Sequence, residues 1–381
     1  MNIAFYAPLK PPDHPRPSGD RRIARLLVRA LTAKGHNVQV ASRFRSREAR
    51  GDGDRQRRLA TIGRRLAERY VRQVLNRSIT SRPQLWFSYH LYYKAPDWLG
   101  PVVSKLLKIP YVVAEASYAP KRDRAPWRMV HHAIGAAIGH AQAIVTLNSD
   151  DVGCLLPLLD KRTERIHRLK PFIDIDAMSM PAPGERCKRE LAARTTLDPS
   201  VPWLISAGMM RAGDKLASYK LLAESLEHLK QHQWQLVVLG DGEARADVQR
   251  AFGSLAGRVH FAGVCDAPQV ARWLSGSDLY VWPAVNEAFG MAFLEAQACG
   301  LPVVAGRTRG VPDVVCDDGS GFLTELRAEA FANGVERLLL DPALRWRMGQ
   351  FAHSYARNTH DINPASEQLD KLFRSLIEPT Q

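Results

Sequence analysis

The sequence of 381 residues predicts an α/β fold of two domains built from parallel βαβ units. The clearest unit spans residues 280–323. In it, a short apolar run is closed by Pro283, residues 290–299 repeat small and apolar side chains with a helical period, and residues 303–305 form a second apolar run. A strand, a helix and a strand in so short a stretch indicate a parallel crossover. A segment poor in large apolar residues, 179–200, predicts a linker between the two halves.

The remaining elements follow from short apolar runs bounded by Gly, Pro or polar residues, which are typical of buried strands, and from apolar positions spaced by three and four, which are typical of helices. In the first half we predict strands at residues 2–7, 38–42, 85–89, 111–114 and 143–148, a strand end at 172–174, and helices at 23–33 and 59–75. In the second half we predict strands at 203–207, 234–240 and 259–264, and helices from about 216, at 328–340, at 343–358 and ending at 377.

The 280–323 unit also predicts a ligand site, because parallel sheets bind ligands outside the carboxyl ends of their strands. Two carboxylates lie near residues 284–291: Glu287 in the loop and Glu295 inside the following helix. A loop carboxylate can reach ligand hydroxyls, while the amides at a helix start suit a phosphate or diphosphate. The alternative is structural, with Glu287 as a helix-dipole partner and Glu295 as a solvated helix residue.

Composition narrows the function classes. No apolar run reaches the roughly 18 residues that a membrane span needs, and the first residues lack the basic start of a signal peptide, so we expect a cytoplasmic protein. Five cysteines without a C-x-x-C pair argue against a disulfide framework and against structural zinc. A phosphate-binding G-x-x-x-x-G-K-[ST] loop and a Ser/His/Asp constellation are also missing from the sequence, which disfavours phosphate hydrolysis and acyl transfer.

The net charge of +14 calls for an anionic partner and is concentrated in residues 43–82. This basic segment holds thirteen arginines against four acidic residues. Two interpretations stay open for its helix: attachment to an anionic membrane surface, or a core-facing helix with a solvated charged face. Nucleic-acid binding is disfavoured, because the segment has only Phe44 and Tyr70 for stacking. The arginines concerned are Arg57, Arg58, Arg64, Arg65, Arg69 and Arg72.

Glu287 and Glu295, followed by ACGLPVVA and by GVPDVVCDDGSGFL, resemble the signature of retaining glycosyltransferases of the GT-B type, group 1 or family 4. The resemblance implies two Rossmann-like domains that face one another across a cleft. An acceptor domain (1–178) and a donor-binding domain (201–361) would be joined by the 179–200 linker, and a last helix (362–381) would cross back onto the first domain.

The resemblance also implies roles for individual residues. Glu287 would contact the donor sugar and Glu295 the ribose hydroxyls, while Arg211 and Lys215 would neutralise the leaving diphosphate, so that no metal and no other cofactor is expected. The remaining donor-binding positions are Phe289, Gly290 and Met291 at the helix start, Gly263 and Val264 beside the base, and Gly19 in the first loop.

On the acceptor side we expect the two loops that follow residues 89 and 114 to open toward the cleft. The function implied is sugar transfer from a nucleotide sugar to a glycan or lipid-linked acceptor with retention, in the cytoplasm and at the inner face of the cell membrane. The alternatives are a nucleotide-sugar epimerase on the same fold, which would not need an open acceptor cleft, and a nonenzymatic basic protein that binds membrane or nucleic acid. The acceptor-side candidates are His90, Glu115, Ser117 and Lys121.

Overall fold

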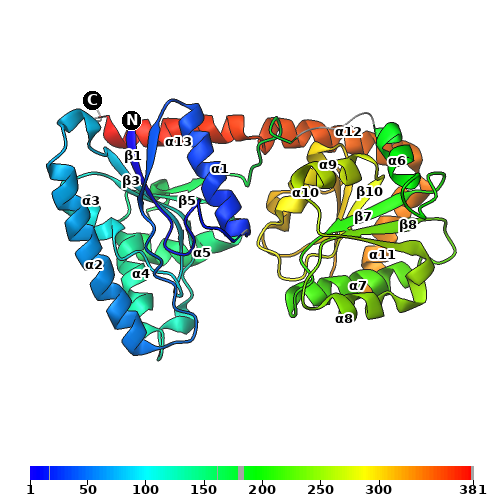
Figure 1. Ribbon diagram of the computed structural model, residues 1–381, viewed down its shortest axis with the longest axis horizontal. Helices are drawn as coiled ribbons and strands as arrows, with labels where there is room; N and C mark the ends of the chain where they lie inside the picture. The colour runs from blue at the N-terminus through cyan, green and yellow to red at the C-terminus, as the bar shows by residue number, and fades with distance from the viewer. Residues whose placement is uncertain (17, 161, 179–183, 379–381) are drawn as a thin grey trace. The chain divides into compact units, whose positions relative to one another are not determined.

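The computed structural model describes residues 1–16, 18–160, 162–178 and 184–378. By its contacts the chain divides into two compact units. Unit 1 comprises Met1–Lys170 and Ile362–Gln381, and unit 2 comprises Pro171–Asp361. The last helix, α13 (Ile362–Ile377), therefore belongs to unit 1, where it packs against α1 (Gly19–Ala33) (Figure 1).

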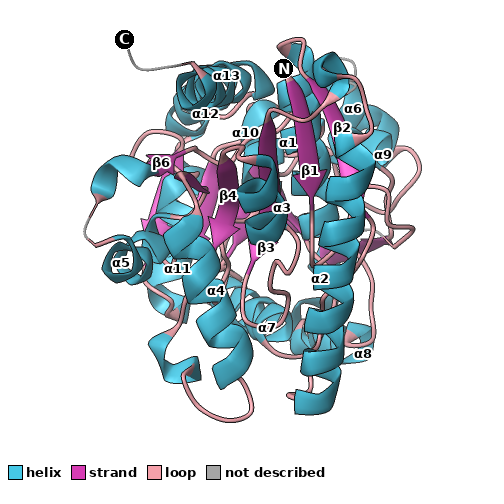
Figure 2. Cartoon of the chain, turned by 90° about the vertical axis from the view of Figure 1, so that its left-hand side faces the viewer, coloured by secondary structure: helices cyan, strands magenta, loops and turns pink. Residues whose placement is uncertain are grey.

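Unit 1 is built on a six-stranded parallel sheet with the order β2-β1-β3-β4-β5-β6. Helices cover both faces of this sheet, as Figure 2 shows. Neighbouring residues of β3 point to opposite faces: Trp86 contacts Tyr70 of α2 with ring centroids 5.5 Å apart, and Phe87 contacts Phe373 of α13 at 5.0 Å. The strands are β1 (Asn2–Tyr6), β2 (Asn37–Ser42), β3 (Leu85–Leu91), β4 (Tyr111–Ala116), β5 (Ala143–Thr146) and β6 (Ile166–Arg168), and the other helices are α2 (Gly53–Leu75), α3 (Gly100–Leu107), α4 (Arg128–His140) and α5 (Val152–Leu155).

Unit 2 is built on a second six-stranded parallel sheet with the order β12-β11-β10-β7-β8-β9. The predicted α/β class with two Rossmann-like domains is thereby confirmed. The strands are β7 (Trp203–Ala207), β8 (Gln235–Leu239), β9 (Val259–Gly263), β10 (Leu279–Trp282), β11 (Val303–Gly306) and β12 (Gly321–Thr324). The helices are α6 (Gly184–Ala192), α7 (Asp214–Glu227), α8 (Arg245–Ala251), α9 (Ala267–Ser275), α10 (Met291–Ala298), α11 (Ala328–Leu340) and α12 (Pro342–Thr359).

Several boundaries differ from the sequence-based expectation. The strand end predicted at 172–174 is wrong: the last strand of the first sheet is β6 (Ile166–Arg168), and Ile173 makes only an isolated bridge with Asp361. Helix α1 begins earlier than predicted because Ser18 caps it, accepting a hydrogen bond from the Arg21 amide (3.3 Å). Within the segment predicted as the linker, residues 179–183 lie outside the described residues, and residues 184–192 form α6, which packs against α9.

The basic helix α2 uses its apolar side to cover the core of unit 1. Its buried positions include Gly63, Ala67, Val71 and Val74, and it packs against α3. The arginines between them are exposed, as expected for the solvated face of a core-packed helix. In the part of the chain that the structure describes, no helix has both the length and the apolar character of a membrane span.

Each sheet has one place where the chain reverses its direction of growth. In unit 1 this switch point lies between β1 and β3, and in unit 2 it lies between β7 and β10. Loops on the two sides of a switch point diverge, which leaves room for a ligand outside the carboxyl ends of the strands. The side chains at these two places are therefore the first candidates for a functional site.

Candidate functional site

An ion pair between Lys215 and Glu287 spans the switch point of unit 2. Lys215 lies in the first turn of α7, which follows β7, and Glu287 lies in the loop that follows β10. Nζ of Lys215 donates to Oε2 of Glu287, and the two side chains are 31% and 21% exposed. The ammonium also lies 5.3 Å from the ring centroid of Trp282, the last residue of β10. Because both groups keep contact with solvent, either can exchange its partner for a ligand.

Side chains of α7 hold the Glu287 loop in place. Ser218 accepts a hydrogen bond from the Val285 amide (2.9 Å), and Asp214 accepts one from the side-chain amide of Asn286 (2.9 Å). Ala284 and Asn286 both adopt left-handed backbone conformations, with φ of 58° and 53°. Such strain persists only where the surroundings impose it, and it gathers at functional sites. The sequence analysis missed Asp214 and Ser218, whose only signal was their position at the start of the helix that carries Lys215.

Gly290 lets the loop turn into α10 beside Glu287. Its φ is 70°, and a Cβ added there would lie 2.7 Å from the Phe293 ring and 3.3 Å from Cγ of Glu287. A side chain at this position would therefore displace Phe293 or Glu287. Phe289 is buried and anchors the loop, whereas Met291 is half-buried at the first position of α10. The first amides of a helix have no partner within that helix, so the start of α10 offers donors beside the carboxylate of Glu287.

Glu295 lies on α10 and is half-buried. Glu295 and Glu287 both lie close enough to Tyr280 to influence it electrostatically. The hydroxyl of Tyr280 lies 3.4 Å from the carbonyl oxygen of Ala207 at the end of β7. Burial raises the pKa of Tyr280 well above its ordinary value, and the negative charges of Glu295 and Glu287 add to this rise. Both carboxylates therefore act on one hydroxyl at the carboxyl edge of the sheet.

Three backbone loops at the same edge are tied together by hydrogen bonds. The Gly208 amide donates to the Leu239 carbonyl (3.0 Å), and the Gly240 amide donates to the Gly263 carbonyl (2.7 Å). Gly240 has to be a glycine, because a Cβ there would lie 2.0 Å from the Gly208 carbonyl oxygen. The Gly-Asp-Gly turn after β8 thus contacts both the loop after β7 and Gly263 at the end of β9.

Arg211 and Val264 stand exposed on these loops. The guanidinium of Arg211 has no hydrogen-bonding or ion-pairing partner among the described residues, so it is available to an anion. Val264 is 79% exposed, an apolar surface beside the Gly263 backbone. A further cation that the sequence analysis missed, Arg309, follows β11 and approaches Oδ1 of Asn286 at 3.4 Å.

At the switch point of unit 1, His90 faces Asp20. Nδ1 of His90 lies 3.1 Å from Oδ1 of Asp20, which is in the first turn of α1. Burial lowers the pKa of His90, but the hydrogen bond and charge of Asp20, together with the charges of Glu115 and Asp151, outweigh it and raise the pKa overall. The sequence analysis missed Asp20, which is 70 positions away from its partner.

Glu115 occupies the corresponding place at the end of the neighbouring strand β4. His90 and Glu115 are both in left-handed backbone conformations, with φ of 62° and 57°. The carboxylate of Glu115 accepts a hydrogen bond from the Leu147 amide (2.6 Å). Two strained, charged residues at the carboxyl ends of adjacent strands mark this edge as a second candidate site.

The other predicted residues of unit 1 take no part in the hydrogen bond between His90 and Asp20 or in the one that Glu115 accepts from Leu147. Ser117 donates its backbone amide to the Leu91 carbonyl (2.9 Å), and Lys121 is exposed on a short turn. Gly19 is the first residue of α1, with no atom within 4 Å of an added Cβ. Within the described ranges, no group of three or more His, Cys, Asp or Glu side chains is arranged as metal ligands.

Comparison with known proteins identifies the family to which unit 2 is similar. Residues 208–355 match the family model of glycosyl transferases group 1. A D-inositol 3-phosphate glycosyltransferase of Xylanimonas cellulosilytica is 32% identical over 62% of this chain and 59% of its own length. An alpha-D-kanosaminyltransferase of Streptomyces kanamyceticus is 30% identical over 56% of this chain and 55% of its own length. The match thus spans little more than half the length of these relatives.

Solved structures confirm the GT-B class of fold. The sucrose-phosphate synthase of Thermosynechococcus elongatus superposes with a TM-score of 0.73 at 18% identity, covering 99% of both chains. The Anabaena HepE protein, solved in complex with UDP and glucose, gives a TM-score of 0.70 at 16% identity, covering 98% of this chain and 99% of its own.

Proposed function

We propose, because residues 208–355 match the family model of glycosyl transferases group 1, that the protein transfers a sugar from a nucleotide sugar to an acceptor hydroxyl, with retention of the anomeric configuration. The observation that carries the proposal is the ion pair of Lys215 and Glu287 at the switch point of unit 2. An anionic ligand and a hydroxyl-bearing ligand can replace the two halves of this pair at once. A nucleotide sugar carries both, as a diphosphate joined to a sugar.

In the proposed complex the diphosphate replaces Glu287 as the partner of Lys215 and also binds Arg211. The guanidinium of Arg211, which has no side-chain partner among the described residues, can bind phosphate oxygens bidentately, and Lys215 supplies a compact charge. The first amides of α10, around Gly290, complete the anion site. Glu287, released from Lys215, accepts hydrogen bonds from the donor sugar, and Glu295 does the same for the ribose hydroxyls. The base lies against the backbone at Gly263 and Val264.

The reaction breaks the bond between the anomeric carbon and the diphosphate oxygen, and forms a bond between that carbon and the acceptor oxygen on the same face. The acceptor proton passes to the leaving diphosphate, which departs as the nucleoside diphosphate. Negative charge grows on the leaving oxygen, so Lys215, Arg211 and the α10 amides lower the barrier by stabilising it. These positioned positive groups do the work that a divalent metal does elsewhere, and the proposal therefore includes no metal.

We propose that unit 1 binds the acceptor, a glycan or a lipid-linked sugar. His90, Asp20 and Glu115 provide charged hydrogen-bonding groups for acceptor hydroxyls at the carboxyl edge of the sheet. The exposed arginines of α2 suggest that the protein works at the cytoplasmic face of a membrane, where anionic headgroups attract such a helix. The support for this step is charge alone, because the apolar side of α2 is used by the core.

The test of the proposed function is the product itself. Nucleotide sugars are incubated with the protein and with simple glycoside and lipid-linked acceptors, and the anomeric proton of the product is followed by NMR. We expect a new glycosidic linkage with the anomeric configuration of the donor. A product with inverted configuration would overturn retention. Conversion of the nucleotide sugar to an epimer without transfer would overturn the transferase assignment.

A further inference from the structure

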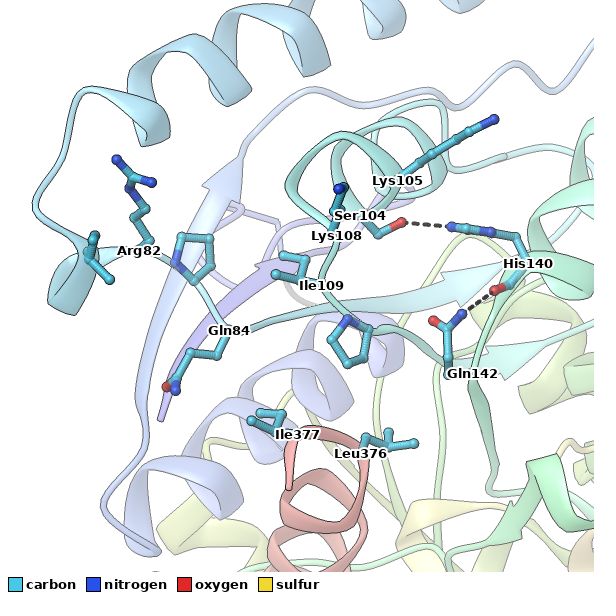
Figure 3. Close-up of a pocket in the computed structure, with 13 residues that line it drawn as sticks. Arg82, Gln84, Ser104, Lys105, Lys108, Ile109, His140, Gln142, Leu376 and Ile377 are labelled. Atoms are coloured by element: carbon cyan, nitrogen blue, oxygen red, sulfur yellow. Dashed lines mark hydrogen bonds between the residues drawn. The ribbon is translucent and has the colours of Figure 1, made fainter. Parts of the chain in front are cut away.

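A pocket of unit 1 lies at the opposite edge of its sheet from His90 and Glu115. It is a pocket of about 700 Å³, and Gln84, Pro110 and Gln142 line it immediately before the strands β3, β4 and β5 begin. We call it the amino-edge pocket. Figure 3 shows the end of α3 on one side and the end of α13 on the other. Nothing in the proposed transfer reaction uses it. Its lining is Ile79, Arg82, Pro83, Gln84, Ser104, Lys105, Lys108, Ile109, Pro110, His140, Gln142, Leu376 and Ile377.

The amino-edge pocket is positively charged. Arg82, Lys105 and Lys108 line it, and no Asp or Glu is among the described residues of its lining. The Arg82 side chain donates hydrogen bonds to the carbonyls of Arg77 (3.2 Å) and Leu75 (2.6 Å). The ammonium groups of Lys105 and Lys108 are exposed and, within the described part of the chain, have no ion-pairing or hydrogen-bonding partner. Two uncompensated ammonium groups at one hollow favour an anion.

The same surface continues past His140 into a smaller hollow of about 510 Å³. That hollow shares His140 and Gln142 with the amino-edge pocket and adds Arg162 and Arg165, with Glu164 as the one acidic residue of its lining. Arg162 is ion-paired with Asp160 (3.5 Å), so the excess of positive groups among the described lining residues comes from the amino-edge pocket itself. The excess is a property of the folded chain, because these residues come from helices and loops far apart in the sequence.

The pKa of His140 depends on the positive charges around the pocket. Nε2 of His140 lies 3.0 Å from the Ser104 hydroxyl, which donates its own proton to the Gly100 carbonyl (2.7 Å), so Nε2 is the donor and Nδ1 is the atom left to take a proton. Burial lowers the pKa of His140, and the charges of Lys105 and Arg165 lower it further. An anion bound beside Lys105 would reverse part of this effect.

The lining of the amino-edge pocket is also partly apolar. Ile79 is 81% exposed, and Ile109, Leu376 and Ile377 line the same pocket. A lining that combines exposed lysines with apolar side chains suits a ligand that carries an anionic group and a neutral or apolar part. Inorganic phosphate alone would leave these apolar side chains uncovered.

We propose that the amino-edge pocket is a binding site for a phosphate ester, with the phosphate held by Lys105 and Lys108 and the neutral part of the ligand against Ile79 and Ile109. Such a phosphate is presented by a soluble sugar or glycerol phosphate and by a phospholipid headgroup. The chemistry recognised is the same in both cases. The site lies at the edge of the sheet opposite to the proposed acceptor residues, so occupancy there does not compete with the acceptor.

The experiment measures the pKa of His140 by NMR of histidine-labelled protein, with the signal assigned from His140→Gln. Two probes are used: glycerol 3-phosphate, and vesicles of phosphatidylcholine with or without phosphatidic acid. We expect one of these phosphates to raise the pKa of His140, and we expect Lys105→Glu with Lys108→Glu to weaken that binding by about tenfold or more. Both lysines are exposed, so the charge reversals should leave the fold intact.

Two controls separate this site from other basic surfaces. Lys220→Glu, an exposed lysine of α7 in unit 2, changes the net charge without touching the pocket and should bind as the wild type does. Arg58→Glu with Arg65→Glu reverses charge on α2 and should leave the His140 response to glycerol 3-phosphate intact. A response to glycerol 3-phosphate assigns a soluble ligand, and a response only to phosphatidic acid vesicles assigns a lipid headgroup. The proposal is overturned if neither probe shifts His140, or if the double lysine variant responds like the wild type.

Discussion

Lys215 and Glu287 are 72 positions apart in the chain, yet they form an ion pair across the two strands, β7 and β10, between which the sheet of unit 2 reverses its direction of growth. The pair is half-buried over the Trp282 ring, beside the start of α10. In the free protein each charge satisfies the other. A ligand that bears an anion and a hydroxyl can displace both, and we propose that the pair marks a ligand site of unit 2.

Substitution of Glu287 and of Glu295 should affect turnover and nucleotide binding differently. Glu287→Gln removes the charge that the proposal places on the donor sugar, and we expect turnover to fall by about 10²-fold with nucleotide binding little changed. Glu295→Ala removes the proposed ribose partner, so nucleotide binding should weaken along with turnover. Steady-state kinetics and calorimetric titration on both variants check this. Wild-type turnover in either variant would remove that residue from the site.

Arg211 and Lys215 should contribute to binding of the diphosphate and not to binding of the nucleoside. Arg211→Ala and Lys215→Ala are expected to weaken binding of the nucleoside diphosphate by about tenfold or more each, while the nucleoside binds as before, because only the diphosphate contacts them. Calorimetric titration of both ligands gives the comparison. Activity should also survive EDTA. A strict requirement for a divalent metal would show that another group stabilises the leaving diphosphate.

Gly290 should tolerate no side chain. Gly290→Ala places a Cβ 2.7 Å from the Phe293 ring in a left-handed backbone conformation, and we expect a loss of about 1–3 kcal/mol of unfolding free energy together with a displaced Glu287. Gly153→Ala is the matched control, because Gly153 lies in α5 with open space around it. Urea unfolding of both variants measures the difference. Equal stability of the two would contradict the close packing of Gly290.

The His90 and Asp20 pair predicts a dependence of stability on pH. The pKa of His90 is raised in the folded protein, so its contribution is fully present below the ordinary value of 6.5 and is lost as the pH rises through the raised value. The pKa of Asp20 is lowered, although burial opposes this, so its contribution is lost as the pH falls through the lowered value.

Comparison of the wild type with His90→Asn, a residue that tolerates the left-handed backbone at this position, isolates the His90 contribution. The stability difference between the two proteins should shrink as the pH rises above 6.5, and Asp20→Asn should lower the pKa of His90 in an NMR titration. An unchanged pKa of His90 in Asp20→Asn would show that the pair does not set it.

The arginines of α2 should mediate attachment to anionic vesicles. Each one near the surface contributes on the order of 1 kcal/mol, and reversal of Arg58, Arg65 and Arg72, which lie on the exposed side of the helix, should release the protein while nucleotide binding persists. High salt should have the same effect, because screening acts within about 10 Å at 0.1 M ionic strength. Cosedimentation is the assay. A wild type that ignores anionic vesicles at low salt would indicate a soluble acceptor.

The sequence predicts most accurately the strands and helices that a local pattern of apolar residues determines. Strands such as β7 and β10 are continuous apolar runs because a parallel sheet is buried on both faces, and the unit from β10 to β11 was predicted with its intervening helix. The short edge strand β6 was missed because its residues are partly exposed and lack that signal. The helices α3, α4, α8 and α9 were not predicted.

The site was predictable in its residue types but not in its pairings. Glu287, Arg211 and Lys215 were named from motifs, yet the bond between Lys215 and Glu287 depends on which strands lie next to each other. Asp20 and His90 meet for the same reason. Asp214 and Ser218 act on the backbone of a loop that follows β10, and no local pattern encodes such a contact.

The central claim, that the Lys215 and Glu287 switch point is a nucleotide-sugar site, is tested most directly by a thermal-shift panel of nucleotide sugars on the wild-type protein. A ligand that binds only the folded state stabilises it by about 2.7 kcal/mol at a hundred times its Kd, which is readily measured. We predict that at least one nucleotide sugar raises the Tm, and that the shift is lost in Lys215→Ala. No shift with any nucleotide sugar, or an equal shift in Lys215→Ala, would contradict the account.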